Sequence, residues 1–210
     1  MIKILIVDDH AVVRAGIKQI VAETSDIVVV DEASQGNEAL EKVWKKDYDV
    51  VILDITMPGK SGLEVLKEIK QDKPHLPVLI LSMHPEEQYA IRTIKAGASG
   101  YLTKESIPDE LLTAIRRVAL GKKYISASLS ELLAENLEFD MEKPLHTLLS
   151  DREYEVMMML TSGKTVRQIA EELSLSVKTI STYRYRILEK MHMKTNAELI
   201  RYVIANKLLD

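Results

Sequence analysis

Residues 50–62 read VVILDITMPGKSG, and this segment decides the fold. Its first four residues form a continuous run of valine, isoleucine and leucine, which is typical of a parallel strand buried on both faces. Asp54 follows the run directly, and a Met-Pro-Gly turn at residues 57–59 comes next. With Gly62 beyond it, this turn predicts a loop that leaves the Asp54 carboxylate open.

Four similar runs precede and follow this segment, at residues 4–7, 28–30, 78–81 and 100–102. Between the runs, apolar residues recur at three- and four-residue spacing, which indicates amphipathic helices. Strand and helix alternate five times, so the sequence predicts an α/β domain, a (βα)5 doubly wound parallel sheet. The first two helical stripes are Val12, Val13, Ile17, Ile20 and Val21, and then Ala39, Leu40, Val43 and Trp44.

Polar side chains stand where the predicted strands end. Because parallel strands share one carboxyl edge, these groups should converge there. Three carboxylates in one place repel each other without a cation, and an oxygen-rich cluster suits Mg²⁺. A lysine and a hydroxyl beside that metal suit an anionic oxygen such as a phosphoryl group. The residues at the strand ends are Asp8, Asp9, Asp54, Ser82, Thr103 and Lys104.

Single residues of these segments have alternative interpretations. A lone aspartate after a strand is usually a helix cap or turn residue, which is our expectation for Asp31. We expect His10 to face water at a helix start rather than to bind a metal. A haloacid dehalogenase-type phosphatase needs a second aspartate two positions after Asp54, where Thr56 stands. No G-x-G-x-x-G motif follows the first strand, which disfavours dinucleotide binding.

The charge is unevenly distributed along the 210 residues, whose net charge is −4. Residues 1–120 hold 15 Lys/Arg and 19 Asp/Glu, whereas residues 148–210 hold 10 and 8. A slightly basic tail makes a nucleic-acid site worth testing. The absence of cysteine excludes disulfides, thiolate metal sites and thiol nucleophiles. No apolar run is long enough to cross a membrane, so we expect a cytoplasmic protein without membrane contact.

Residues 121–147 change character and are predicted to form a partly helical linker. Only helical patterns follow, which indicates a smaller all-α domain at residues 148–210. Ser150 and Glu153 form a capping box at its first helix, and Ser176 caps a later one. Two short helices, a tight turn and a basic third element predict a helix-turn-helix.

The third element has a polar outward face. Short hydroxyl groups reach base edges and cationic groups hold phosphates, which favours the major groove of DNA. A helix bundle for protein contacts is the alternative. The residues of this face are Lys178, Ser181, Thr182, Tyr185, Arg186 and Lys190.

Four segments, LIVDDH, VVILDITMPGKSG, LILSMH and GYLTK, together resemble the receiver domain of two-component response regulators over residues 1–120. The resemblance implies that Asp54 accepts a phosphoryl group from a sensor histidine kinase, and that Lys104 and Ser82 contact that group. It implies that Ser82 and Tyr101 form a conformational switch. Glu105 follows Lys104 where many receivers have proline. The implied Mg²⁺ ligands are Asp8, Asp9, Asp54 and the backbone carbonyl of Thr56.

Residues 148–208 resemble the LuxR-type helix-turn-helix of NarL/FixJ-type regulators. The resemblance implies base or groove contacts from Ser181, Thr182 and Tyr185, and phosphate contacts from Thr179 and Lys190. Tyr183 stands where a histidine is frequent. The residues that carry the resemblance are Leu149, Arg152, Glu153, Gly163, Ile169, Ala170, Leu173, Ser176, Thr179, Ile180, Ile187, Lys190, Met191, Asn196, Glu198 and Leu199.

Both resemblances imply a phosphorylation-dependent, DNA-binding transcriptional regulator that forms a homodimer on activation. Such a protein is not an enzyme, beyond assisting its own phosphorylation and dephosphorylation. The alternative is a constitutive protein-interaction module with an inert receiver.

Overall fold

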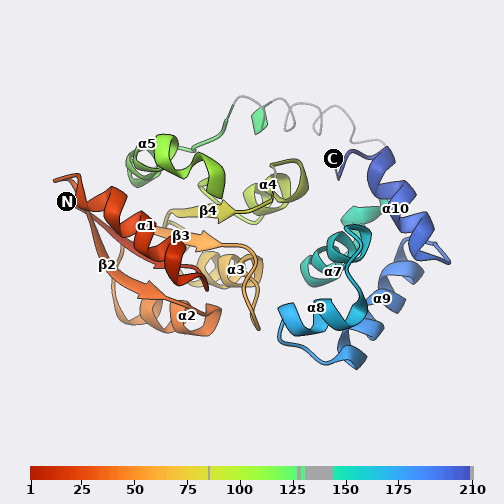
Figure 1. The fold of residues 1–210 in the computed structure, drawn as a ribbon. Helices are drawn as coiled ribbons and strands as arrows, with labels where there is room; N and C mark the ends of the chain where they lie inside the picture. The colour runs from red at the N-terminus through yellow and green to blue at the C-terminus, as the bar shows by residue number, and fades with distance from the viewer. Residues whose placement is uncertain (85, 127–128, 131–143, 209–210) are drawn as a thin grey trace. The chain divides into compact units, whose positions relative to one another are not determined.

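The computed structural model describes all residues except 85, 127–128, 131–143 and 209–210. The chain folds into two compact units, Met1–Leu133 and Ala134–Asp210 (Figure 1). Most of the predicted linker helix lies outside the described residues. Among those that are described, no helix has the length and apolar character needed to cross a membrane.

The first unit is built on one five-stranded sheet in which every neighbouring pair is parallel. The strand order is β2-β1-β3-β4-β5, so β1 and β3 lie side by side in the middle of the sheet. The predicted (βα)5 doubly wound fold is therefore confirmed. The strands are β1 (Ile2–Val7), β2 (Ile27–Ala33), β3 (Val50–Asp54), β4 (Val78–Ser82) and β5 (Gly100–Thr103).

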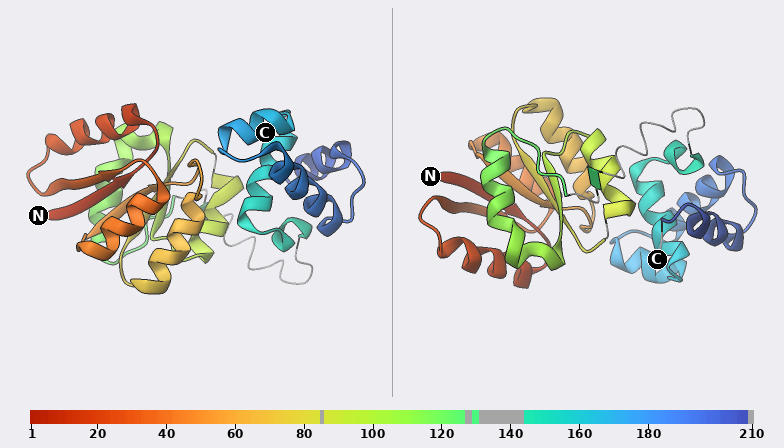
Figure 2. Two further views of the ribbon diagram at one scale, coloured as in Figure 1. Left: turned by 90° about the horizontal axis from the view of Figure 1, so that it is seen from below. Right: turned by 90° about the horizontal axis from the view of Figure 1, so that it is seen from above.

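Helices cover both faces of this sheet, with α1 beside α5 on one face and α2 beside α3 on the other (Figure 2). Every residue of β3 and β4 is buried, because helices shield the two faces and neighbouring strands shield the edges. The helices are α1 (Ala11–Ala22), α2 (Gly36–Lys45), α3 (Gly62–Asp72), α4 (Glu86–Lys95) and α5 (Ile107–Ala119), with the short η1 (Lys104–Ser106) before α5.

Strand β2 extends furthest beyond the run that predicted it, from residues 28–30 to Ile27–Ala33. It pairs only with β1, so this edge strand is partly exposed and polar residues interrupt its apolar run. Asp31 lies inside the strand, and the expectation of a cap or turn residue was wrong. Its Oδ2 accepts hydrogen bonds from Lys46 Nζ at 2.7 Å and from the Tyr48 hydroxyl at 2.8 Å.

Two apolar residues of the helical stripes lie at the surface instead of in the core. Val12 is 84% exposed in the first turn of α1. Trp44, the only tryptophan of the chain, is 53% exposed at the end of α2. Its indole Nε1 donates a hydrogen bond to Asp72 Oδ2 of α3 at 2.9 Å. The indole therefore links two helices from outside the core.

The second unit is all-helical. Ser150 and Glu153 form the predicted capping box at α7, and Ser176 Oγ accepts from the Thr179 amide at α9. Ser174 has a left-handed φ of 53°, which turns the chain sharply between α8 and α9. The predicted helix-turn-helix is thus confirmed. The helices are η2 (Leu145–Leu148), α7 (Asp151–Thr161), α8 (Val166–Glu172), α9 (Val177–Lys190) and α10 (Asn196–Ala205).

Candidate functional site

The carboxyl edge of the sheet brings together Asp8, Asp54 and Lys104. Val7 of β1 pairs with Leu53 of β3, so the residues that follow them are neighbours. Asp8 and Asp54 are 1% and 2% exposed, so the prediction that the following loop leaves the Asp54 carboxylate open was wrong. Lys104 Nζ lies 2.7 Å from Asp8 Oδ2 and 2.7 Å from Asp54 Oδ2. Glu105, which replaces the frequent proline, lies in η1 and leaves Lys104 in contact with both carboxylates.

Burial dominates the electrostatics of Asp54. Desolvation raises the pKa of its carboxyl to about 6, against the lowering effect of Lys104, while Asp8 adds a further rise. Burial lowers the pKa of Lys104, but the nearby charges of Asp54 and Asp8 outweigh it and the net shift is upward. Lys104 is therefore protonated and positively charged at neutral pH. The ionised form of Asp54 is stabilised by any additional positive charge nearby.

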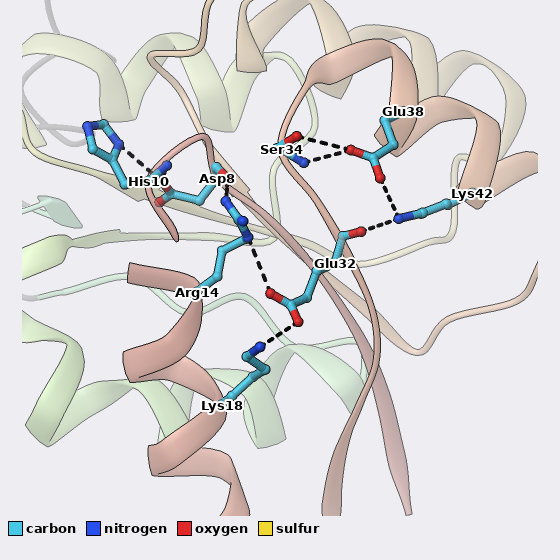
Figure 3. Close-up of polar contacts among 8 residues, drawn as sticks. All are labelled: Asp8, His10, Arg14, Lys18, Glu32, Ser34, Glu38 and Lys42. Atoms are coloured by element: carbon cyan, nitrogen blue, oxygen red, sulfur yellow. Dashed lines mark hydrogen bonds and ion pairs between the residues drawn. The ribbon is translucent and has the colours of Figure 1, made fainter. Parts of the chain in front are cut away.

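Asp9 and His10 complete an acidic cluster with Asp8 and Asp54. One ligand atom from each of the four residues lies within 4.8 Å of the others. His10 Nδ1 is 2.8 Å from Asp9 Oδ1. It is also 3.2 Å from Asp8 Oδ1 (Figure 3). As expected, His10 stands at the start of α1 with 62% of its side chain exposed.

This donor set fits Mg²⁺. Asp8 Oδ2 and Asp9 Oδ1 are buried and accept no hydrogen bond of good geometry in the described part of the chain, although both touch a basic side chain. Carboxylate oxygens left in this condition are the ligands that Mg²⁺ prefers. The Thr56 amide donates to Asp54 Oδ1 at 3.3 Å, which places this residue beside the cluster. A metal contact from the Thr56 carbonyl stays a prediction.

Ser82 and Tyr101 meet at the backbone of His84, a residue that the sequence analysis missed. Both side chains are fully buried. The His84 amide donates to Ser82 Oγ at 3.0 Å, and the Tyr101 hydroxyl donates to the His84 carbonyl at 2.8 Å. Thr56 Oγ1 also lies 3.3 Å from His84 Nε2. His84 stands in the LILSMH segment, but nothing in that pattern showed that it joins the two switch candidates.

The outward face of α9 is exposed along most of its length. The exposed candidates are Lys178, Ser181, Thr182, Tyr185 and Arg186, whereas Thr179 and Lys190 are half-buried. Tyr185 is 67% exposed. A surface hollow over the same helix is lined by Ser176, Lys178, Thr179, Thr182, Tyr183 and Arg186.

Lys190 differs from the other candidates because it has a partner in another helix. Its Nζ lies 2.6 Å from Oε2 of Glu153, which is 3% exposed. Burial raises the pKa of Glu153, but hydrogen bonds from Lys190 and Ser150 outweigh it and hold the pKa below its usual range. The ammonium group thus secures the capping box of α7, which the sequence analysis did not anticipate.

Two protein families match the two units. The response regulator receiver domain matches residues 4–116, and the luxR family of bacterial regulatory proteins matches residues 147–203. The response regulator UvrY of Escherichia coli (strain K12) is 37% identical over 211 aligned residues, which cover 100% of this chain and 97% of that protein.

Solved structures of full-length regulators are also similar. RcsB from Salmonella enterica serovar Typhimurium, bound to promoter rprA with the phosphomimetic BeF3⁻, matches 98% of this chain and 100% of its own, with a TM-score of 0.66 and 25% identity. A structure of two RcsB dimers bound to two parallel DNAs matches 97% of this chain and 98% of its own, with a TM-score of 0.60 and 27% identity.

Proposed function

Since this chain belongs to the NarL/FixJ family of response regulators, DNA-binding proteins that regulate transcription, we propose that Asp54 accepts a phosphoryl group from a sensor histidine kinase. One observation carries the assignment. Asp54 is the buried carboxylate that ends the central strand and that Lys104 contacts at 2.7 Å. The alternative of an inert receiver in a protein-interaction module is not favoured, because both units match DNA-binding regulators.

The transfer needs little from the protein beyond position and charge. A carboxylate oxygen of Asp54 attacks the phosphorus of the phosphohistidine on the kinase, and the histidine imidazole departs from the opposite side. Lys104 and Ser82 hold the phosphoryl oxygens. The residues that would hold Mg²⁺ are Asp8, Asp9, Asp54 and, through its carbonyl, Thr56, and the bound ion would supply charge neutralisation. By this chemistry the receiver promotes its own phosphorylation and dephosphorylation, and it modifies no other molecule.

The conformational change that follows phosphorylation depends on the two backbone hydrogen bonds of His84. When Ser82 Oγ turns to a phosphoryl oxygen, the His84 amide loses its acceptor, and the loop that carries the acceptor of Tyr101 is released. The side chain of Tyr101 then follows the loop. This arrangement supports a two-state receiver in which phosphorylation shifts the populations.

The output is the face of α9, placed in the major groove of double-stranded DNA in the cytoplasm. Activated chains form a homodimer that reads two half-sites about one helical turn apart. Thr182, Ser181 and Tyr185 face base edges, and the remaining candidates hold phosphates. Those remaining residues are Lys178, Thr179, Arg186 and Lys190.

The acceptor is tested by mixing the full chain with acetyl phosphate and Mg²⁺ and measuring its mass. We expect the wild type to gain one phosphoryl group and Asp54→Asn to gain none. A chain that never gains the group, or gains it equally after the substitution, contradicts the assignment.

The output is tested by DNA selection followed by affinity measurements with and without beryllofluoride. We expect tighter binding and a doubled particle mass with the mimic. Equal affinities and an unchanged mass exclude the switch.

A further inference from the structure

Arg14, on the first turn of α1, bridges the acidic cluster to strand β2. Its Nη1 donates to the backbone carbonyl of Asp8 at 2.7 Å, and its Nε donates to Glu32 Oε2 at 3.2 Å (Figure 3). Only 18% of the Arg14 side chain is exposed. One guanidinium thus contacts the turn after β1 and the neighbouring strand at the same time.

Glu32 is itself fixed on both sides. Lys18 Nζ lies 2.6 Å from Glu32 Oε1, and Lys42 Nζ donates to the backbone carbonyl of Glu32. The hydrogen bond from Lys18 holds the pKa of Glu32 below its usual range, so its carboxylate is charged at neutral pH. Arg14 is therefore anchored to a rigid, negatively charged residue.

Asp8 is held at several points, and Arg14 supplies one of them. The Asp8 amide donates to the carbonyl of Ala33 at 3.1 Å, and Asp8 Oδ1 accepts from the His10 amide at 2.8 Å. The Asp8 carbonyl accepts from Arg14. Loss of the guanidinium leaves this carbonyl without that donor and lets the turn that carries Asp8 and Asp9 rotate.

We propose that Arg14 is a positioning residue for the metal site, which holds the turn after β1 so that the carboxylates of Asp8 and Asp9 face Asp54. The inference rests on the proposed magnesium site. Outer partners of this kind set metal affinity by orienting the ligands.

A positioning role and a purely electrostatic role of Arg14 predict opposite changes in metal affinity. A cation beside a metal site repels the metal, so charge alone predicts tighter metal binding when Arg14 is removed. A positioning role predicts weaker metal binding when Arg14 is removed. Arginine is also needed specifically, because its planar fork serves Asp8 and Glu32 in two directions, which the single Nζ of lysine does not do.

The test uses Mn²⁺ as a spectroscopic probe of the full-length chain, with free Mn²⁺ followed by electron paramagnetic resonance. We expect the Kd to rise about 10-fold in both Arg14→Gln and Arg14→Lys. Arg116→Gln is the matched control, because it removes an exposed arginine–carboxylate ion pair with Asp26 and leaves the contacts of Arg14 and Glu32 in place; its Kd should stay at the wild-type value. An unchanged or lower Kd in both Arg14 variants overturns the proposal.

A second measurement separates positioning from a general loss of structure. The rate of Asp54 phosphorylation by acetyl phosphate is measured against Mg²⁺ concentration. We expect the midpoint to move upward in Arg14→Lys while the maximal rate and the melting temperature are retained. A lower maximal rate with an unmoved midpoint overturns the proposal. If the wild type itself takes no phosphoryl group, the proposed function fails, which the Mn²⁺ titration distinguishes from a failure of Arg14.

Discussion

The edge of the receiver sheet and the outer face of α9 are built in opposite ways. At the sheet edge, Asp54 is 2% exposed and contacts Lys104, which directly follows another strand, β5. On α9, Tyr185 is 67% exposed, and Thr182 Oγ1 donates to the Lys178 carbonyl of its own helix at 3.0 Å. The sheet edge is thus organised by the fold before any ligand arrives, whereas most side chains of the α9 face are exposed to solvent. Substitutions at the edge should disturb structure or chemistry, and substitutions at the exposed positions of α9 should disturb binding alone.

The largest effect is expected from Gly62→Ala, beneath the acceptor loop. A Cβ at this position would lie 1.9 Å from the backbone oxygen of Asp54, which ends a fully buried strand. We expect the receiver to lose about 3 kcal/mol of unfolding free energy, measured by urea denaturation and circular dichroism. Gly16→Ala is the control, since nothing lies within 4 Å of its Cβ and alanine should stabilise the middle of α1 by about 0.5 kcal/mol. Equal effects of the two changes contradict the tight packing.

Lys104→Met should reduce chemistry at the same edge. Without the ammonium group, the phosphoryl charge loses its fixed cation and Asp8 and Asp54 lose their common partner. We expect the initial rate of phosphorylation by acetyl phosphate to fall about 100-fold, near 2.7 kcal/mol, as measured by mass spectrometry. Arg116→Met breaks an exposed ion pair with Asp26 instead and should leave the rate unchanged. A wild-type rate in Lys104→Met would remove this residue from the site.

Lys190→Met tests the one candidate on α9 that resembles the sheet edge. Its loss leaves the buried carboxylate of Glu153 without a cation. We expect the second unit to lose about 1–2 kcal/mol of stability in urea denaturation, together with weaker binding to all DNA sequences. Lys178→Met, at an exposed position, should weaken DNA binding without the loss of stability. A normal stability for Lys190→Met would show that its contact with Glu153 contributes nothing.

The smallest effects should come from the exposed part of α9. Tyr185→Ala should cost about 1 kcal/mol on the preferred sequence and alter the ranking of sequences, measured by fluorescence anisotropy. Arg186→Ala should weaken all sequences alike and reduce the salt dependence by about one unit of slope. Neither change should alter stability. A uniform loss from both would assign Tyr185 to the phosphate backbone.

The sheet edge was predictable from sequence because position along the chain determines position in a parallel sheet. Asp8, Asp54 and Lys104 each follow a buried run, and the strands point the same way. The helix-turn-helix was predictable for a similar reason, since its caps and turn are local. The roles of the individual residues remain proposals in both units.

Contacts between distant residues could not be predicted in the same way. Glu153 and Lys190 lie 37 residues apart in two helices, and no periodicity relates them. Apolar spacing placed Val12 and Trp44 on the apolar faces of their helices. How much of such a face is buried depends on the neighbouring helices, and both residues lie in the exposed part. Asp31 was misjudged because an edge strand tolerates polar residues that a central strand excludes.

The position of Trp44 has a practical consequence. It is the only indole in the chain, and it bridges α2 and α3 of the receiver. Intrinsic fluorescence excited at the red edge therefore reports on the first unit alone, while the helical signal of circular dichroism reports on both. Recording the two signals in one titration would resolve the melting of each unit without cutting the chain, and would assign every stability change above to its own half of the molecule.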